Sequence, residues 1–289
     1  MKKLLLSVIL LPLLGGCLGV EAVKVLAYAP GYIDATVTIA GRLYQVARPI
    51  SDQEEYYIGR AVAGRLLATY KLSENRKLTD YLNLVGSSIV LHSDRVDTFG
   101  GYHFALIESE EPNAFACPGG TIFVTTGMVK FASNEDQLAA VLAHEIAHIN
   151  NFDGIAEIKK SRWTGLFSAI GTSAAKQYGP DEIAQVAGML DEAVDDVFQA
   201  LVVSGYSRDN EYRADETALT YVTKAGYDPA SYREFLNSLI RSGRATEGGI
   251  IKTHPSTAER IDRTREKTWA KADPALMQSR TDRFFTAVK

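Results

Sequence analysis

The sequence predicts an α+β domain that is mostly helical and carries a small β-sheet. Segments with helical caps and helical apolar spacing make up most of the chain after residue 50. Among them stand two short runs, 102–108 and 121–126, with the β-branched and aromatic composition of strands. The chain has 289 residues, which is enough for one compact domain with a sizeable core.

The elements follow in a simple order. Residues 51–54 form a capping box that begins with Ser51, and helical periodicity runs from there to about Tyr70. A second helix is expected over about Lys77–Leu91, and then come the two strands, joined by the loop Asn113–Gly120. This order places a small sheet beside the helix that comes next.

That next helix has the composition of a buried element. The segment 133–136 is a second capping box, with Ser133 as the expected N-cap. The run Gln137–Ala143 is apolar nearly all round, so the helix should be mostly enclosed. Stop signals follow at Asn150, Asn151 and Gly154.

This helix carries the pattern H-E-x-x-H at residues 144–148. Because a helix turns once in about 3.6 residues, His144 and His148 share a face and can bind one metal ion. Glu145 lies about 100° round the helix, beside the metal, where a general base for an attacking water belongs. The alternative is a core helix with two hydrogen-bonded histidines, and the glutamate between them argues against it.

A second acidic pair offers the third protein ligand that a catalytic zinc ion usually has. Glu211 and Asp215 are again four residues apart, so a helix would point both carboxylates the same way. Glu211 can ligate zinc, and Asp215 can accept the second ring N–H of a ligating histidine and fix its orientation. The alternative is an exposed acidic helix face paired with Arg208 and Arg213.

Together these motifs resemble those of a known family. H-E-I-A-H followed by E-Y-R-A-D is similar to the gluzincin metallopeptidases of the CAAX-prenyl-protease/HtpX type, in particular to the soluble branch of periplasmic BepA- and LoiP-like and mitochondrial Oma-type proteases. Three further stretches match, and the resemblance spans about residues 51–265: Asn113–Gly120, Ile122–Gly127 and Thr253–Ile261. Cys117 departs from the family pattern, which usually has an aliphatic residue before Pro-Gly-Gly. It is expected to be a small buried hydrophobe, and the alternative is a free thiol near the groove.

The resemblance implies a zincin-like metalloprotease domain with an active-site helix and an edge-exposed sheet. It implies one zinc ion per chain, with His144, His148 and Glu211 as ligands and Glu145 as catalytic base. In relatives, the loop that holds His254 lies against the metal site. His254 is therefore a candidate fourth ligand that holds the enzyme latent, or a donor to the oxyanion.

Other roles stay open between two interpretations. Arg260 is the second candidate oxyanion donor. His254 could instead be a loop histidine that caps the following helix. Asn113, Ala114 and Phe115 are the candidate edge for pairing with an extended substrate, and the alternative is an ordinary loop that packs Phe115 inward.

The N-terminus has the features of an export signal. After a basic start, Leu4–Leu14 is an apolar run of 11 residues, too short to span a bilayer. The segment Leu14–Cys17 resembles a bacterial lipobox, which implies cleavage after residue 16 and lipidation of Cys17. Leu18 rather than Asp favours the outer over the inner membrane, by analogy with Gram-negative sorting. The alternative is an ordinary secretory signal with an incidental Cys17.

The predicted layout has four parts: a signal peptide (1–16), a lipidated N-terminus and stalk or docking segment (17–50), a zinc metallopeptidase domain (51–265) and a helical C-terminal tail (266–289). Residues 157–204, with helical stretches around 163–177 and 182–201, are either a lid or a pair of packing helices. A further amphipathic helix is expected at about 230–242, and 243–249 is expected to be a flexible loop. Repeats of about 34 residues are absent from the sequence.

The predicted function is that of a zinc-dependent metalloendopeptidase in the periplasm. The net charge is −4 and no basic stripe is present, so nucleic acid is an unexpected partner. The expected partners are unfolded or misfolded envelope proteins and, through the lipid anchor, the membrane. Two other classes remain: a lipid-anchored assembly factor or chaperone with gated or silent proteolysis, and a structural zinc protein. Glu145 and Glu211 are both retained, which argues against an inactive enzyme.

Overall fold

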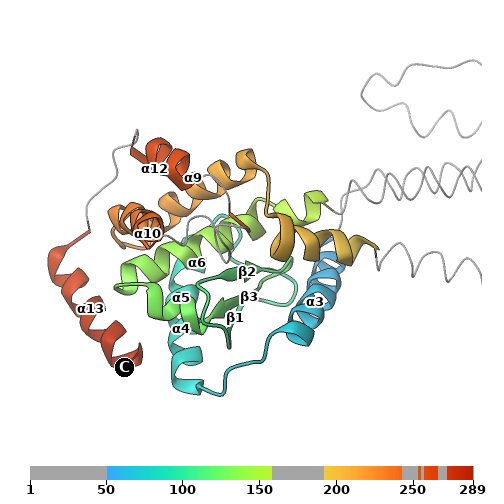
Figure 1. Cartoon of the computed structure of the whole chain (residues 1–289), viewed down its shortest axis with the longest axis horizontal. Coiled ribbons are helices and arrows are strands. Elements are labelled where there is room, and N and C mark those ends of the chain that lie inside the picture. The colour runs from blue at the N-terminus through green and yellow to red at the C-terminus, as the bar shows by residue number, and fades with distance from the viewer. Residues whose placement is uncertain (1–50, 158–191, 243–252, 255–256, 266–271, 289) are drawn as a thin grey trace, which may run out of the picture. The chain divides into compact units, whose positions relative to one another are not determined.

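The computed structural model describes residues 51–157, 192–242, 253–254, 257–265 and 272–288 (Figure 1). All of them belong to one compact unit, Pro49–Lys289. The prediction of a mostly helical α+β fold with a small sheet is confirmed. The predictions for the signal peptide, Cys17 and the stalk, and those for 158–191 and for the loop 243–249, lie outside the described residues.

The first two helices agree closely with the sequence prediction. Helix α3 (Asp52–Thr69) begins with the predicted capping box. The Ser51 hydroxyl accepts a hydrogen bond from the Glu54 amide, and the Glu54 carboxylate accepts one from the Ser51 amide at 2.9 Å. Helix α4 (Arg76–Val90) begins after Asn75, whose side chain accepts from the Leu78 amide.

The sheet has three strands, in the order β1-β3-β2. Strand β1 (His103–Ile107) runs parallel to β3 (Thr121–Thr125). Strand β2 (Ala114–Ala116) pairs antiparallel with β3 and forms one edge of the sheet. It lies inside the segment predicted as a loop, because three residues are too few to give a period-2 pattern. At the other edge, Leu72 bridges to Ile107, so this edge is partly covered.

The short helix α5 (Thr126–Phe131) leads from the sheet into α6 (Glu135–Asn150), the predicted active-site helix. As predicted, α6 is enclosed: all its residues from Glu135 to Ile149 are buried. The prediction of Ser133 as N-cap was wrong by one residue. The Asn134 side chain accepts from the Gln137 amide at 2.9 Å, and asparagine caps a helix as well as serine does.

In the C-terminal half, two helices pack along α6, one packs on these two, and the last docks at the start of α6. These are α9 (Arg208–Lys224), α10 (Ala230–Arg241), α12 (Thr257–Arg265) and α13 (Pro274–Val288). Helix α13 comes from the predicted tail, which is helical over this range. It buries Phe284 in the core, and Arg280 and Arg283 form ion pairs with Asp136 and Glu135 of α6.

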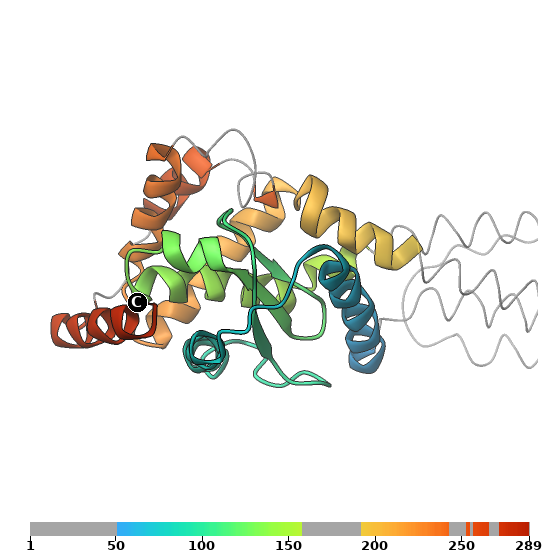
Figure 2. The ribbon, with the colours of Figure 1, turned by 60° about the horizontal axis from the view of Figure 1, so that its bottom comes forward.

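Helices lie on both faces of the sheet (Figure 2). The buried side chains form two hydrophobic cores. In β2, Ala114 and Ala116 face the larger core, which contains side chains of α4, α6, α9, α10 and α13. Phe115 and Cys117 face the smaller core, with α3, the helical residues 192–199 and the π-helix η1 (Ala200–Ser204). Cys117 is fully buried, as predicted, and burial raises the pKa of its thiol. Among the described helices, none combines the length and the apolar character needed to cross a membrane.

Candidate metal centre

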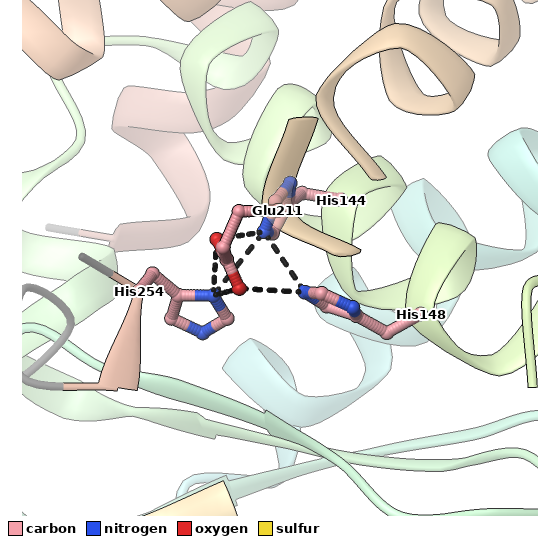
Figure 3. A group of neighbouring side chains, drawn as sticks. All are labelled: His144, His148, Glu211 and His254. Carbon is pink, nitrogen blue, oxygen red and sulfur yellow. Dashed lines mark hydrogen bonds and ion pairs between the residues drawn. The ribbon is translucent and has the colours of Figure 1, made fainter. Parts of the chain in front are cut away.

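Three segments bring four buried side chains to one point (Figure 3). His144 and His148 lie one turn apart on the same face of α6. Glu211 lies in the first turn of α9, which begins after Ser207, whose side chain accepts from the Asn210 amide. His254 comes from the segment 253–254, far along the chain. All four side chains point toward one another and are at most 4% exposed.

The candidate ligand atoms of these four side chains all lie within 4.8 Å of one another, close enough to bind one metal ion. His144 Nε2 lies 3.1 Å from His148 Nε2 and 3.2 Å from His254 Nδ1. The Glu211 carboxylate oxygens lie 3.4 Å from Nε2 of each α6 histidine and 3.0 Å from His254 Nδ1. Tetrahedral zinc, with bonds of about 2.0–2.2 Å, separates its ligand atoms by about 3.3–3.6 Å. Three imidazoles and one carboxylate are also ligand types that zinc prefers, so these residues fit zinc.

Glu145 lies beside this cluster and outside its coordinating set. Its side chain is 1% exposed, and Oε1 has no hydrogen-bond partner among the described residues. His254 Nε2 lies 3.6 Å from Oε1. A buried carboxylate oxygen without a partner is costly unless a water or substrate group pairs with it. The position therefore suits a group that receives a proton.

His144 is oriented by an enclosed network of three residues. Asp215 Oδ1 lies 3.0 Å from His144 Nδ1, the ring nitrogen that faces away from the metal cluster. Tyr232 donates to the same carboxylate at 2.6 Å, and Arg260 donates to both of its oxygens, at 2.6 and 2.8 Å. Burial would raise the pKa of Asp215, but Arg260 holds it well below its ordinary value. The carboxylate therefore stays ionised and accepts the His144 N–H.

His148 is supported on its other nitrogen by a second carboxylate. Asp153 Oδ2 lies 2.7 Å from His148 Nδ1, and the other oxygen of Asp153 forms an ion pair with Arg213. The ring of Tyr206 packs on the imidazole, with centroids 4.5 Å apart. Burial lowers the pKa of His148, but hydrogen bonds to Asp153 and Glu211 raise it to about 10. A metal ion bound at Nε2 would displace the proton held there.

Arg260 is placed against the acidic groups of the site. Besides its bonds to Asp215, its Nη1 lies 3.2 Å from Glu211 and 3.4 Å from the carbonyl oxygen of His254. Burial would raise the pKa of Glu211, but His254 and Arg260 hold it well below its ordinary value. This geometry favours a positioning role for Arg260 over that of an oxyanion donor.

The sequence comparisons agree with this geometry. Residues 73–268, more than half of the chain, match the sequence model of the family described as Peptidase family M48. The chain belongs to peptidase family M48. This membership confirms the resemblance that the motifs of α6 and α9 predicted.

The relatives of this chain include two bacterial proteases and one mitochondrial metalloendopeptidase. The beta-barrel assembly-enhancing protease of Escherichia coli K12 is 27% identical over 272 residues, which cover 91% of this chain and 53% of the relative. Metalloprotease LoiP of the same organism is 23% identical and covers 66% of this chain and 69% of the relative. The mitochondrial metalloendopeptidase OMA1 of Schizosaccharomyces pombe is 31% identical, with 65% of this chain and 52% of the relative covered. The chain thus spans about half the length of the first of these relatives.

The side chains of the three residues predicted to form the substrate-binding edge are buried. Asn113, Ala114 and Phe115 are at most 6% exposed. Phe115 packs inward against Tyr70, as the alternative interpretation expected, so any contact with substrate there would involve the main chain. The Asn113 side chain accepts from the Ala114 amide at 2.9 Å and from Thr253, the neighbour of His254.

Three residues of this site, Asp153, Tyr232 and Tyr206, were not predicted from the sequence. Asp153 lies five positions after His148, among residues interpreted only as a helix stop. Tyr232 lies 88 positions from His144, at a distance for which no spacing rule exists. Tyr206 precedes the N-cap of α9, and no sequence motif around it indicates a place in the site. A search for carboxylates just beyond the H-E-x-x-H helix could have found Asp153.

Proposed function

We propose that this chain is a zinc-dependent metalloendopeptidase that hydrolyses peptide bonds in unfolded or misfolded proteins of the bacterial envelope. The observation that carries this proposal is the position of Glu145, which is buried beside a cluster that fits zinc and has no hydrogen-bond partner at Oε1 among the described residues. A structural zinc site would not need such a carboxylate. The M48 relatives that match this chain are themselves named proteases.

His144, His148 and Glu211 would hold the zinc ion, with Asp215 orienting the imidazole of His144. When bound, zinc would polarise the scissile carbonyl and lower the pKa of the attacking water. Glu145 accepts the proton of that water at Oε1 and returns it to the departing amine.

His254 is best explained as a group that holds the site latent. Its Nδ1 lies 3.0 Å from both oxygens of Glu211 and 3.2 Å from His144 Nε2, so it takes the fourth corner of the cluster. A catalytic zinc site keeps that position open for water and substrate. This placement also favours a second candidate function, a lipid-anchored envelope assembly factor or chaperone whose proteolysis is gated.

His254→Ala separates the two roles of this residue. Latency predicts faster cleavage and self-degradation, whereas oxyanion stabilisation predicts a fall in kcat of roughly 10²-fold. Cleavage of an unfolded protein and zinc affinity are measured together. Unchanged values of both would leave His254 with a structural role alone.

An extended substrate would pair with the edge of β2 that faces away from β3, where no other strand of the described residues lies. Phe115 lies opposite Phe123, and the Cys117 amide donates to Thr121 across the ladder. Because main-chain groups alternate along a strand, those of Ala114 and Ala116 face away from β3. The Asn113 side chain already occupies the Ala114 amide, which leaves the Ala114 carbonyl and the Ala116 amide and carbonyl directed to a partner strand.

We place the protein in the periplasm of a Gram-negative bacterium, anchored by lipid on Cys17, at the outer rather than the inner membrane. The lipobox-like segment 14–17 and Leu18 support this location. The similarity to the beta-barrel assembly-enhancing protease of Escherichia coli K12 also supports it. Cys17→Ser should remove acyl labelling and release the protein from the membrane fraction; an unlabelled wild type would contradict the anchor.

Glu145→Gln tests the enzymatic function. It removes the base and keeps every ligand, so zinc should stay near one per chain while cleavage of an unfolded protein falls by about 10²-fold or more. Glu234→Gln, an exposed position on α10, is the matched control and should cleave like the wild type. The proposal is wrong if Glu145→Gln cleaves as fast as wild type, or if wild type neither retains nor regains zinc.

A further inference from the structure

The active-site helix ends in a turn that brings a carboxylate back to its own second histidine. After α6, Asn151 and Phe152 form the turn, and the helical residues 153–157 begin at Asp153. The Phe152 amide donates to Ile149, and the Phe152 carbonyl accepts from Ala156. Only five positions separate Asp153 from His148, so the turn between them brings this carboxylate within reach of the imidazole.

The turn requires an unusual backbone conformation. Phe152 has φ of 58°, and among the described residues it is the one non-glycine residue with positive φ. A bulky side chain is strained in this left-handed region, and such strain persists where the surroundings enforce it. Burial of the ring does not explain it, because Phe152 is 43% exposed. The ring is covered on one face by Arg95, at 4.6 Å from its centroid.

Asp153 is held from three sides. It is fully buried, with Oδ2 at 2.7 Å from His148 Nδ1 and Oδ1 paired with Arg213 of α9. Gly154 packs the turn against the loop between β2 and β3: a Cβ added there would lie 3.0 Å from the Pro118 ring. The carboxylate therefore has little freedom to move away from the imidazole.

We propose that Asp153 is a positioning residue of the metal centre, and that the left-handed turn at Phe152 is what holds it in place. By accepting the Nδ1 proton, Asp153 fixes the tautomer of His148 and directs Nε2 at the metal. The inference rests on the proposed zinc site, and it assigns Asp153 and Phe152 a role in metal binding that does not depend on cleavage.

Zinc affinity of the full chain, measured by competition with a chelator, tests the role of Asp153. Asp153→Ala should weaken zinc binding by about 10- to 100-fold, the usual effect of losing such a partner. Asp153→Asn keeps the shape of the side chain and one acceptor oxygen. This variant should therefore fold and lose less zinc affinity than Asp153→Ala. With Co²⁺ in place of zinc, the absorption spectrum should shift in both variants, because the orientation of a ligand changes. Asp209→Asn, an exposed carboxylate on α9, is the control and should match wild type.

A pair of variants tests the turn. Phe152→Gly and Phe152→Val both remove the ring, but glycine accepts positive φ and a β-branched residue does not. Phe152→Gly should bind zinc within about threefold of wild type, whereas Phe152→Val should lose about tenfold, as Asp153 is displaced. Equal zinc affinities of the two variants would show that the left-handed turn at Phe152 does not hold Asp153 in place.

The outcomes separate this inference from the proposed function. Asp153→Ala with wild-type zinc affinity and an unchanged Co²⁺ spectrum would overturn the role of Asp153 and leave the enzyme proposal standing. Wild type that binds zinc tightly without cleaving any unfolded protein would overturn the enzyme and leave Asp153 in its role. Wild type with no affinity for zinc would overturn both.

Discussion

The two histidines of α6 are equally buried, yet their supports differ in kind. His144 depends on Asp215, Tyr232 and Arg260, which come from three other helices and are all at most 3% exposed. His148 depends on Asp153, five residues away, and then on Arg213, whose side chain is 51% exposed. One support is a long-range network closed to water, and the other is a local turn that ends at the surface.

This difference in exposure determines how much each support contributes to the stability of the folded domain. Charges enclosed in a protein interact strongly, and removing one partner leaves the other buried and uncompensated. A half-exposed guanidinium is replaced by water at little cost. The His144 side should therefore couple metal binding to the folding of the whole domain, while the His148 side should affect the metal site with little effect on global stability.

Arg260→Gln should produce the largest effect on the His144 side. It leaves Asp215 without its main cationic partner and removes one of the two cationic neighbours of Glu211, at a cost of about 3–5 kcal/mol in the free energy of unfolding. Zinc needs Glu211 ionised and would itself neutralise it, so the loss should be larger without metal. Urea unfolding with and without zinc measures both values. A loss below about 1 kcal/mol in the metal-free protein would contradict the enclosed network.

The fold was predictable wherever the signal is local. The capping box at Ser51 and the periodicities of α3, α4 and α10 depend on residues within one or two turns, so their limits were predicted within one or two residues. Strand β2 was not predicted, because three residues are too few to show the alternating pattern of a strand. The N-cap of α6 was predicted one residue too early, because serine and asparagine cap helices equally well.

The same distinction applies to the site. The i, i+4 spacing predicted that His144 and His148 would share a face, and so would Glu211 and Asp215. Tyr232 could not be predicted, because its contact with Asp215 depends on how α10 packs beside α9. Asp153 is close in sequence but needs a left-handed phenylalanine, which sequence rules disfavour. The contact between Asp153 and His148 was therefore not predicted because it depends on a strained turn, although the two residues are close in the sequence.

Tyr232→Phe offers a milder test of the enclosed side. It removes one hydroxyl that donates to Asp215 at 2.6 Å and leaves both bonds from Arg260 in place. A hydrogen bond to a buried charge contributes about 1.5–3 kcal/mol, so the free energy of unfolding should fall by that amount. Urea unfolding measures it, with Tyr57→Phe on the exposed face of α3 as the control. A loss as small as that of the control would place Tyr232 outside the network.

Arg213→Gln should have the smallest effect and complete the comparison. The guanidinium pairs with Asp153 but is half exposed, and it also donates to Asn210 at 3.2 Å. An ion pair at such a position contributes about 0–1 kcal/mol, because water and salt screen it. The free energy of unfolding should therefore change by less than about 1 kcal/mol, while zinc affinity falls by a few-fold as Asp153 loses one of its supports. Unfolding and chelator competition on the same samples measure the two quantities. A stability loss as large as that of Arg260→Gln would show that the His148 side is closed to water after all, and that exposure does not distinguish the two supports.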